Sequence, residues 1–155
     1  MNIIKSIEEL DPNAVVLPNI VRSLQLDFYS CGVQSVFVIL NYFRKSPSVD
    51  TIERELQTDH TGTSLGAMER VFKKRGFKCW IIRKLSLKQI RDYIDADSSV
   101  LITTLDRWRY AVVYGYSEEH VFVVDPSVRC NLFCRIPKKR FLEQQWDKWM
   151  MVASS

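Results

Sequence analysis

The hydrophobic pattern of this chain changes its period near residue 98, and this change limits the folds that the chain can form. Before it, apolar residues recur at helical spacing, which predicts helices over 31–44, 51–56, 65–74 and 87–93 and one strand over 78–83. After it, runs rich in valine, isoleucine and aromatic residues predict strands over 99–104, 109–114, 120–124, 132–136 and 148–152, and a short helix over 137–143. A hairpin turn is expected over 115–119. The first residues, up to about 25, form a lead-in interrupted by prolines. Helices followed by an antiparallel sheet give an α+β fold class.

Composition places the chain among ordinary globular proteins. Its 155 residues fit a single domain over 1–155, with 46% hydrophobic and 26% charged residues. The net charge of +4 comes from short basic runs spread along the chain, whereas a nucleic-acid-binding protein concentrates them on one face. The N-terminus lacks the apolar core of a signal peptide, and no apolar run approaches the ~20 residues of a membrane span. We therefore expect a cytoplasmic protein that binds no nucleic acid and has no membrane span.

The expected cytoplasmic location also predicts the oxidation state of the cysteines. In the cytoplasm, the default state of Cys31, Cys79, Cys130 and Cys134 is the free thiol. Cys130 and Cys134 are separated by three residues, but no second pair or neighbouring histidine completes a metal-binding set. We expect these two cysteines to be core residues of a strand, and we expect no metal and no other cofactor.

Gln25 and Cys31, six residues apart, give the strongest chemical signal. Cys31 opens a predicted helix, where the helix dipole and free backbone N–H groups favour a thiolate over a thiol. Gln25 lies on an extended segment just before that helix and could donate a hydrogen bond to an oxyanion. Most free cysteines are small buried apolar residues instead. Cys31 alone would fit that description, whereas its spacing from Gln25 favours a catalytic nucleophile.

The order of these and later segments resembles the C39 peptidases, the papain-like domains of bacteriocin and quorum-peptide ABC exporters that cut leader peptides after a double glycine. The matching segments are Gln25 to Gly32 before an apolar helix, 62–66, 74–77, the strand 109–116, the Asp-Pro pair that ends 121–126, and 141–146. The resemblance implies a papain-like cysteine peptidase fold, with N-terminal helices packed on an antiparallel sheet. It also implies a site of Cys31, Gln25, Asp125 and a histidine on the strand before Asp125.

The expected histidine is missing from that strand. Counting back from Asp125 without a gap puts Arg109 in the histidine position, and a one-residue bulge would put Tyr110 there. A guanidinium has no acceptor and stays protonated, so Arg109 can neither take a proton from Cys31 nor protonate a leaving amine. It could pair with Asp125 and hold Cys31 as a thiolate by its charge. Loss of general acid–base help costs a factor of about 10²–10⁴ in rate. A smaller departure is Ser30, which replaces the usual aspartate and can still cap the helix.

The two histidines of the chain are poor substitutes for the missing base. His60 lies in a loop before Gly62, and movement of its side chain toward the site remains an alternative. His120 is five residues from Asp125, so strand alternation puts the two side chains on opposite faces. We expect both histidines at the surface or at an edge. Trp108 and Tyr110 are candidates for a substrate groove, although aromatic residues at alternating strand positions usually belong to the core.

The resemblance is compatible with three functions, and the sequence alone does not distinguish between them. We favour a C39-like domain that binds a peptide, with a leader segment as the expected ligand, and has impaired or absent peptidase activity. The alternative is an active cysteine peptidase that cleaves double-glycine-type leader peptides with a non-standard base. Thiol chemistry on another acyl group is a third possibility. In each case the partner is a peptide or protein, and an ABC exporter in trans is a candidate. Whether the chain is an enzyme stays open.

Overall fold

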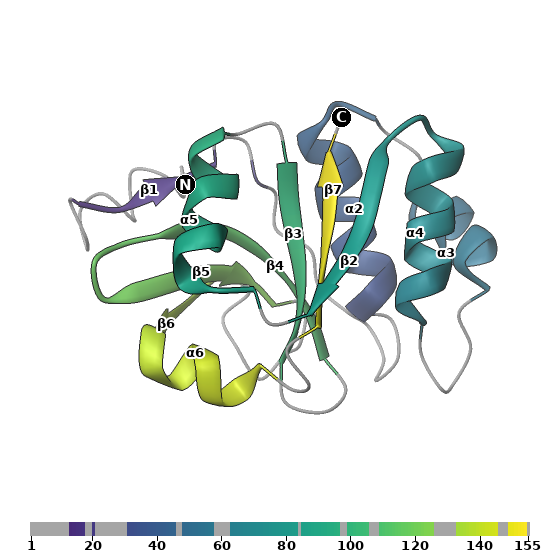
Figure 1. Ribbon diagram of the computed structural model, residues 1–155. Helices are drawn as coiled ribbons and strands as arrows, with labels where there is room; N and C mark the ends of the chain where they lie inside the picture. The colour runs from purple at the N-terminus through teal and green to yellow at the C-terminus, as the bar shows by residue number, and fades with distance from the viewer. Residues whose placement is uncertain are drawn as a thin grey trace.

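The computed structural model has an antiparallel sheet with helices on both faces (Figure 1). It describes residues 13–17, 20, 31–45, 48–57, 63–83, 85–96, 99–105, 109–125, 133–145 and 149–154. The helices within these residues are α2 (Cys31–Tyr42), α3 (Val49–Leu56), α4 (Leu65–Lys74), α5 (Leu87–Ala96) and α6 (Lys138–Gln144). The strands are β1 (Val15–Val16), β2 (Lys78–Arg83), β3 (Ser99–Leu105), β4 (Arg109–Tyr116), β5 (His120–Val124), β6 (Phe133–Pro137) and β7 (Trp149–Ser154). The predicted α+β class is confirmed.

The sheet has the strand order β2-β7-β3-β4-β5-β6, and β1 pairs with β4 outside this path. All of its pairings are antiparallel. The register between β4 and β5 shifts between Val113 and Gly115, where β1 also approaches β4. A Cβ atom on Gly115 would lie 2.6 Å from Cγ1 of Val16, so only glycine permits this approach. The lead-in therefore contains a strand that was not predicted, because two residues are too few for a periodic pattern.

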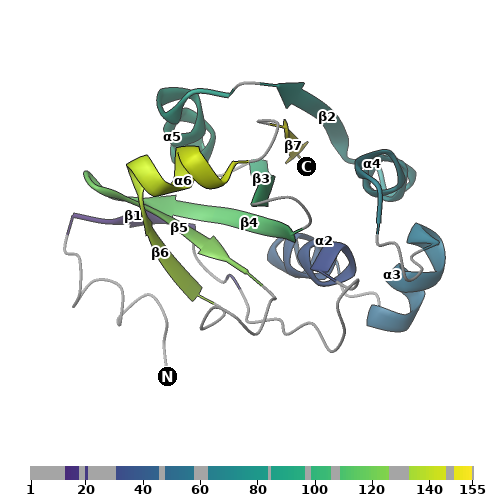
Figure 2. The same cartoon turned by 90° about the horizontal axis from the view of Figure 1, so that it is seen from below.

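Helix α2 is the central helix of the fold. Figure 2 shows α2 against one face of the sheet and α5 and α6 against the other. Nine of the 12 residues of α2 are buried, and Val33, Val36 and Leu40 have no exposed surface. A helix can be apolar on nearly all sides when it is enclosed in this way, here by β4 and by α3. This enclosure fixes the N-terminus of α2, and with it Cys31, against the sheet.

Short polar side chains begin the smaller helices. The Ser48 hydroxyl accepts the N–H of Thr51 at 3.2 Å at the start of α3, and Ser64 caps α4 in the same way. At the start of α5, Ser86 and Gln89 bond reciprocally, each accepting the other's backbone N–H. These caps explain why α4 begins where it was predicted and why α3 begins two residues earlier, at the residue after Ser48.

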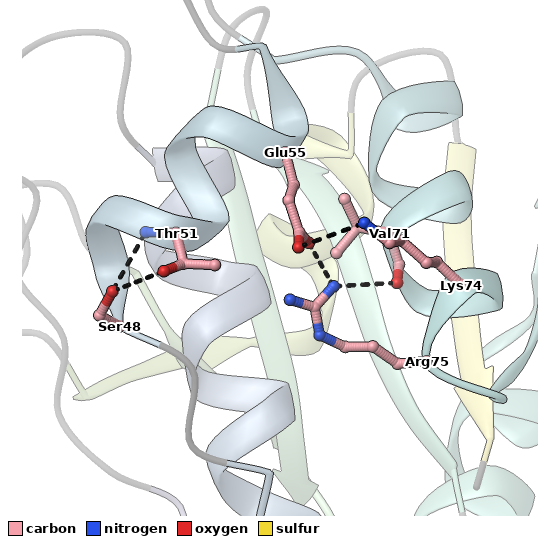
Figure 3. A network of polar contacts seen from close by, with 6 residues as sticks. All are labelled: Ser48, Thr51, Glu55, Val71, Lys74 and Arg75. Carbon is pink, nitrogen blue, oxygen red and sulfur yellow. Dashed lines mark hydrogen bonds and ion pairs between the residues drawn. The ribbon is translucent and has the colours of Figure 1, made fainter.

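Charged side chains join α3 to α4 (Figure 3). The guanidinium of Arg75 donates to the carboxylate of Glu55 and, at 3.4 Å, to the carbonyl of Val71. Lys74 lies 3.6 Å from the same carboxylate. The hydrogen bond from Arg75 lowers the pKa of Glu55, which keeps the carboxylate charged. This network holds α3 and α4 together.

The remaining boundaries agree with the predictions to within a few residues. β2 and β5 match, α5 continues three residues further to Ala96, and β4 continues to Tyr116. The turn between β4 and β5 is therefore shorter than predicted. It is closed by Ser117, whose N–H donates to the carbonyl of His120 and whose hydroxyl accepts the N–H of His120.

Candidate functional site

Cys31 is the first residue of α2, and its sulfur touches β4. The backbone N–H of Tyr110 donates to the Cys31 Sγ, with an N···S distance of 3.4 Å. The backbone N–H groups of Cys31 and Gly32 also form hydrogen bonds to this sulfur. Cys31 is only 4% exposed. The predicted proximity of Cys31 to the strand before Asp125 is confirmed, and the sulfur is surrounded by donors from two elements.

Burial raises the pKa of the Cys31 thiol above its ordinary value of 9.0. The hydrogen bond from Tyr110 lowers this pKa, the charge of Asp125 raises it, and the N–H groups of Gly32 and Cys31 lower it again. The balance favours the neutral thiol, because removing a thiolate from water costs more than the backbone donors return. The expectation that the helix N-terminus and a nearby guanidinium hold Cys31 as a thiolate is therefore wrong.

Arg109 and Asp125 form an ion pair beside Cys31. Nη1 of Arg109 lies 2.7 Å from Oδ2 of Asp125. Asp125 follows the end of β5 and Arg109 begins β4, and the antiparallel pairing of these strands brings the two together. The Asp125 side chain is 2% exposed, and a carboxylate buried this deeply needs a cationic partner to stay ionised. The predicted ion pair is confirmed, and it supports the gap-free alignment over the bulged one.

The side chain of Tyr110 contacts Thr63, whereas its backbone contacts Cys31. Its hydroxyl donates to the backbone carbonyl of Thr63 at 2.7 Å. Burial, together with the nearby Cys31, raises the pKa of Tyr110 to about 12, so the phenol remains a neutral donor. Tyr110 therefore contacts the site twice, through its backbone at Cys31 and through its hydroxyl at Thr63. Its predicted role in a substrate groove is not tested by these contacts.

Thr63 is the neighbour of the site that sequence reasoning missed. A Cβ atom on Gly32 would lie 2.8 Å from Cβ and 2.9 Å from Oγ1 of Thr63. Thr63 is thus packed against the first turn of α2 on one side and bonded to Tyr110 on the other. The glycine directly after Cys31 is the one local signal of such a close approach, and it does not identify the partner.

His120 occupies the opposite end of β5 from Asp125. It begins the strand, pairs with Pro137 and is partly buried. Five residues of strand correspond to about 17 Å, so His120 is remote from the end of β5 that carries Asp125. Other residues of the predicted site lie outside the described residues, namely Gln25, His60 and Trp108.

The cysteines differ from the expectation of four free thiols. Cys134, on β6, is disulfide-bonded. Cys31 and Cys79 are the free cysteines among the described residues, and Cys130 lies outside them. Cys134 is 6% exposed and pairs in register with Val123 of β5. Sequence reasoning assigned free thiols from an assumed compartment, and it considered the Cys130–Cys134 spacing only as part of a possible metal-binding set.

Within the described part of the chain, no group of three or more His, Cys, Asp and Glu residues could hold a metal ion. Across the same residues, no helix has the length and apolar character that crossing a membrane requires.

The site and fold can be compared with known proteins. The peptidase domain of Streptococcus ComA, a bifunctional ABC transporter involved in quorum sensing, superposes with a TM-score of 0.75 at 20% identity, covering 88% of this chain and 98% of that one. The double-glycine-motif protease of an AMS/PCAT transporter, solved with a leader peptide, gives a TM-score of 0.72 at 13% identity, covering 87% and 91%. The peptidase domain of Streptococcus mutans ComA gives 0.65 at 20% identity, covering 86% and 98%.

These structural similarities show the fold alone. No curated relative matches the chain. The sequence model of the Peptidase C39 family matches residues 19–155, a span that includes α2, the complete sheet from β2 to β7, and the Cys31, Arg109 and Asp125 positions. With a match over most of its length and a sheet and central helix of the same arrangement, the chain belongs to the Peptidase C39 family.

Proposed function

We propose that this chain is a C39-like domain, comprising residues 1–155, that binds a peptide but has impaired or absent peptidase activity. The observation that carries the proposal is the contact of 2.7 Å between Arg109 and Asp125. The side chain that meets the carboxylate is a guanidinium, which can neither accept nor release a proton at any useful pH. Amide cleavage requires both transfers, from the thiol and to the leaving nitrogen.

The protonation state of Cys31 supports the same proposal. Its thiol pKa is raised by burial and by the charge of Asp125, so little thiolate is present at neutral pH. In a cysteine peptidase a neighbouring base compensates for a weak thiol by taking its proton. Among the described residues beside Cys31, Tyr110 is a neutral phenol and Arg109 is a cation. Neither takes that proton at neutral pH.

The expected ligand is a leader peptide. One of the similar structures is that of a double-glycine-motif protease in complex with its leader peptide, and others are peptidase domains of a quorum-sensing ABC transporter. By analogy with these proteins, the ligand of this chain is a peptide or protein cargo, and an ABC exporter in trans is the candidate partner. By the same analogy the module would act in the cytoplasm, where the disulfide of Cys134 is an unusual feature.

An active peptidase with a non-standard base is the second candidate. The observation in its favour is that Cys31 has kept its position at the start of α2, with three backbone N–H groups directed at the sulfur. These donors would hold an oxyanion as well as a sulfur. The base would then have to come from the substrate, a partner or a residue outside the described part of the chain.

The test compares binding and cleavage of synthetic double-glycine leader peptides by the unmodified chain, Cys31→Ala and Arg109→His. We expect all three to bind, the unmodified chain to cleave little or nothing, and Arg109→His to cleave faster by a factor of about 10²–10⁴. Fluorescence anisotropy measures binding, and mass spectrometry measures cleavage. Cleavage by the unmodified chain that is lost in Cys31→Ala would establish the active peptidase and end the present proposal.

A further inference from the structure

The strand β2 lies at one edge of the sheet, beside β7 (Figure 2). The central apolar residues of the two strands pair in register, Trp80 with Val152, Ile81 with Met151 and Ile82 with Met150. The three residues of β7 have no exposed surface, whereas the three residues of β2 are all partly exposed. Both strands are apolar and belong to the same sheet, so the exposure of β2 arises from its position at the edge.

Helices cover both faces of β2, which leaves its backbone edge as the open part. On one face Cys79 is buried near Glu69 and Lys73 of α4, whose charges act on its thiol. On the other face the ring of Trp80 lies 6.3 Å from the ring of Tyr93 on α5. Every second residue of an antiparallel edge strand directs both its N–H and its C=O away from the partner strand. β2 therefore presents a row of backbone groups that no described strand pairs.

The opposite edge of the sheet is protected against pairing. β6 carries the exposed Arg135 in its centre and ends at Pro137, which has no N–H to donate. In β2 the charged residues are Lys78 and Arg83 at the two ends, and the four residues between them are apolar. The centre of β2 thus lacks the residues that keep an edge strand from accepting a further strand.

We propose that β2 is a docking edge for an extended segment of a partner protein, with apolar residues in its centre and acidic residues at both ends. Such a segment would join the sheet as a strand beside β2. In this general mode of recognition, main-chain hydrogen bonds supply affinity and side chains supply specificity. The apolar residues of the partner would cover the exposed parts of Trp80, Ile81 and Ile82. Its acidic ends would lie opposite Lys78 and Arg83.

The charges at the ends of β2 select against a second copy of this chain. If two β2 strands paired antiparallel over their full length, Lys78 of each would lie opposite Arg83 of the other. Like charges directly opposite each other destabilise a strand pair, whereas opposite charges stabilise it. Lys78 is exposed and forms no ion pair with the residues that the structure describes. Charge complementarity therefore favours an acidic segment from a different protein.

This edge is distinct from the site at Cys31. The strand that contacts Cys31 is β4, and β7 and β3 lie between it and β2. At a strand spacing of about 4.8 Å, the separation of β2 from β4 is about 14 Å. Occupation of the docking edge therefore requires neither Cys31 nor Arg109, and both surfaces could be occupied at once.

The test uses a heptapeptide of alternating valine and threonine with a glutamate at each end, and a second peptide with a lysine at each end. Hydrogen–deuterium exchange of the complete chain, read by mass spectrometry, locates the binding. We expect the glutamate-ended peptide to slow exchange in β2. It should bind about tenfold more tightly than the lysine-ended peptide, because two attractive charge pairs replace two repulsive ones. N-methylation of its amides should abolish the protection, since docking needs main-chain hydrogen bonds.

Charge reversal supplies the matched comparison. Lys78→Glu/Arg83→Glu should reverse the preference, so that the lysine-ended peptide binds more tightly. Lys139→Glu/Arg140→Glu changes the net charge equally at exposed positions of α6, and it should keep the preference of the unmodified chain. Circular dichroism verifies that both variants fold.

Three results would overturn the docking edge. The first is no protection of β2 at millimolar glutamate-ended peptide, and the second is equal protection by the two peptides. The third is a dimer of the unmodified chain in sedimentation that itself protects β2, because the occupant would then be a second copy. None of these results changes the expected binding of a leader peptide at Cys31, which is measured separately.

Discussion

Asp125 acts on two neighbours at once: it accepts a hydrogen bond of 2.7 Å from Arg109, and its charge raises the pKa of Cys31. In a cysteine peptidase the carboxylate orients a base that carries the proton of the thiol. Here the side chain that pairs with the carboxylate is a permanent cation, so the carboxylate has no proton-transfer partner to orient. The proposed function rests on this arrangement, in which the partner of the Asp125 carboxylate cannot carry a proton.

The pH dependence of Cys31 alkylation should reflect its raised pKa. An ordinary thiol is half ionised at its pKa of 9.0, whereas the alkylation rate at Cys31 should reach half of its maximum at a higher pH because its pKa is raised. Cys79, whose burial raises its pKa to about 12, should react more slowly than Cys31. The measurement is iodoacetamide labelling followed by peptide mass spectrometry at several pH values. A rate at Cys31 that levels off well below pH 9 would contradict the raised pKa.

Substitution of Asp125 should change this reactivity in a defined direction. Because the charge of Asp125 raises the pKa of Cys31, Asp125→Asn should lower that pKa and increase the labelling rate at neutral pH. Asp92→Asn, on the exposed side of α5, serves as the matched control and should leave the rate unchanged. A slower rate in Asp125→Asn would show that the carboxylate does not act on the thiol through its charge.

Loss of Arg109 should destabilise the fold more than loss of Asp125, because it leaves a buried carboxylate without its partner. Arg109→Gln leaves a carboxylate that is 2% exposed without its partner, which costs about 3–5 kcal/mol in the free energy of unfolding. Asp125→Asn should cost less, since the partly exposed guanidinium can reach water. Arg109→Gln/Asp125→Asn should recover much of the loss. Urea unfolding of the four proteins completes the cycle, and a double variant as unstable as Arg109→Gln would contradict this account.

The sequence predicts the fold well because the fold depends on periodic patterns. The apolar residues of α2, the cap of α4 by Ser64 and the continuous apolar run of β5 are local features, and each of these elements begins where these features indicate. β1 escapes prediction because its two residues form a strand only through β4. The position of Arg109 beside Asp125 could be predicted because it depends on counting along a hairpin.

The protonation state of the site could not be predicted from the sequence. A cysteine at a helix N-terminus indicates a thiolate, but the pKa depends on how completely Cys31 is buried, and burial is a property of the tertiary structure. Thr63 was missed for a similar reason, since its contacts with Gly32 and Tyr110 connect distant segments. The disulfide of Cys134 was missed because the compartment was assumed first and the thiol state was inferred from it.

The contact between Gly32 and Thr63 predicts that a single methyl group destabilises the site. In Gly32→Ala the new Cβ would lie 2.8 Å from Cβ of Thr63 and 2.9 Å from Cε of Met68, and overpacking of this kind costs about 1–3 kcal/mol. Gly66→Ala is the matched control, because its Cβ meets nothing within 4 Å and alanine favours a helix by up to about 1 kcal/mol. Thermal unfolding should therefore show a lower Tm for Gly32→Ala and an equal or higher Tm for Gly66→Ala. Equal Tm values for the two variants would mean that Thr63 yields without cost.

The hydroxyl of Tyr110 should protect Cys31 by holding Thr63 in place. Tyr110→Phe removes the bond of 2.7 Å to the Thr63 carbonyl, which costs about 0.5–1.5 kcal/mol. Burial is the largest cause of the raised pKa of Cys31, so a loosened Thr63 should admit water, lower that pKa and speed alkylation at neutral pH. Tyr116→Phe removes a comparable bond, of 2.6 Å to Asp95, at a distance from the site. It should cost similar stability without changing the alkylation rate of Cys31. If both variants change that rate equally, the effect comes from general destabilisation, and Tyr110 has no specific role in positioning the loop at Cys31.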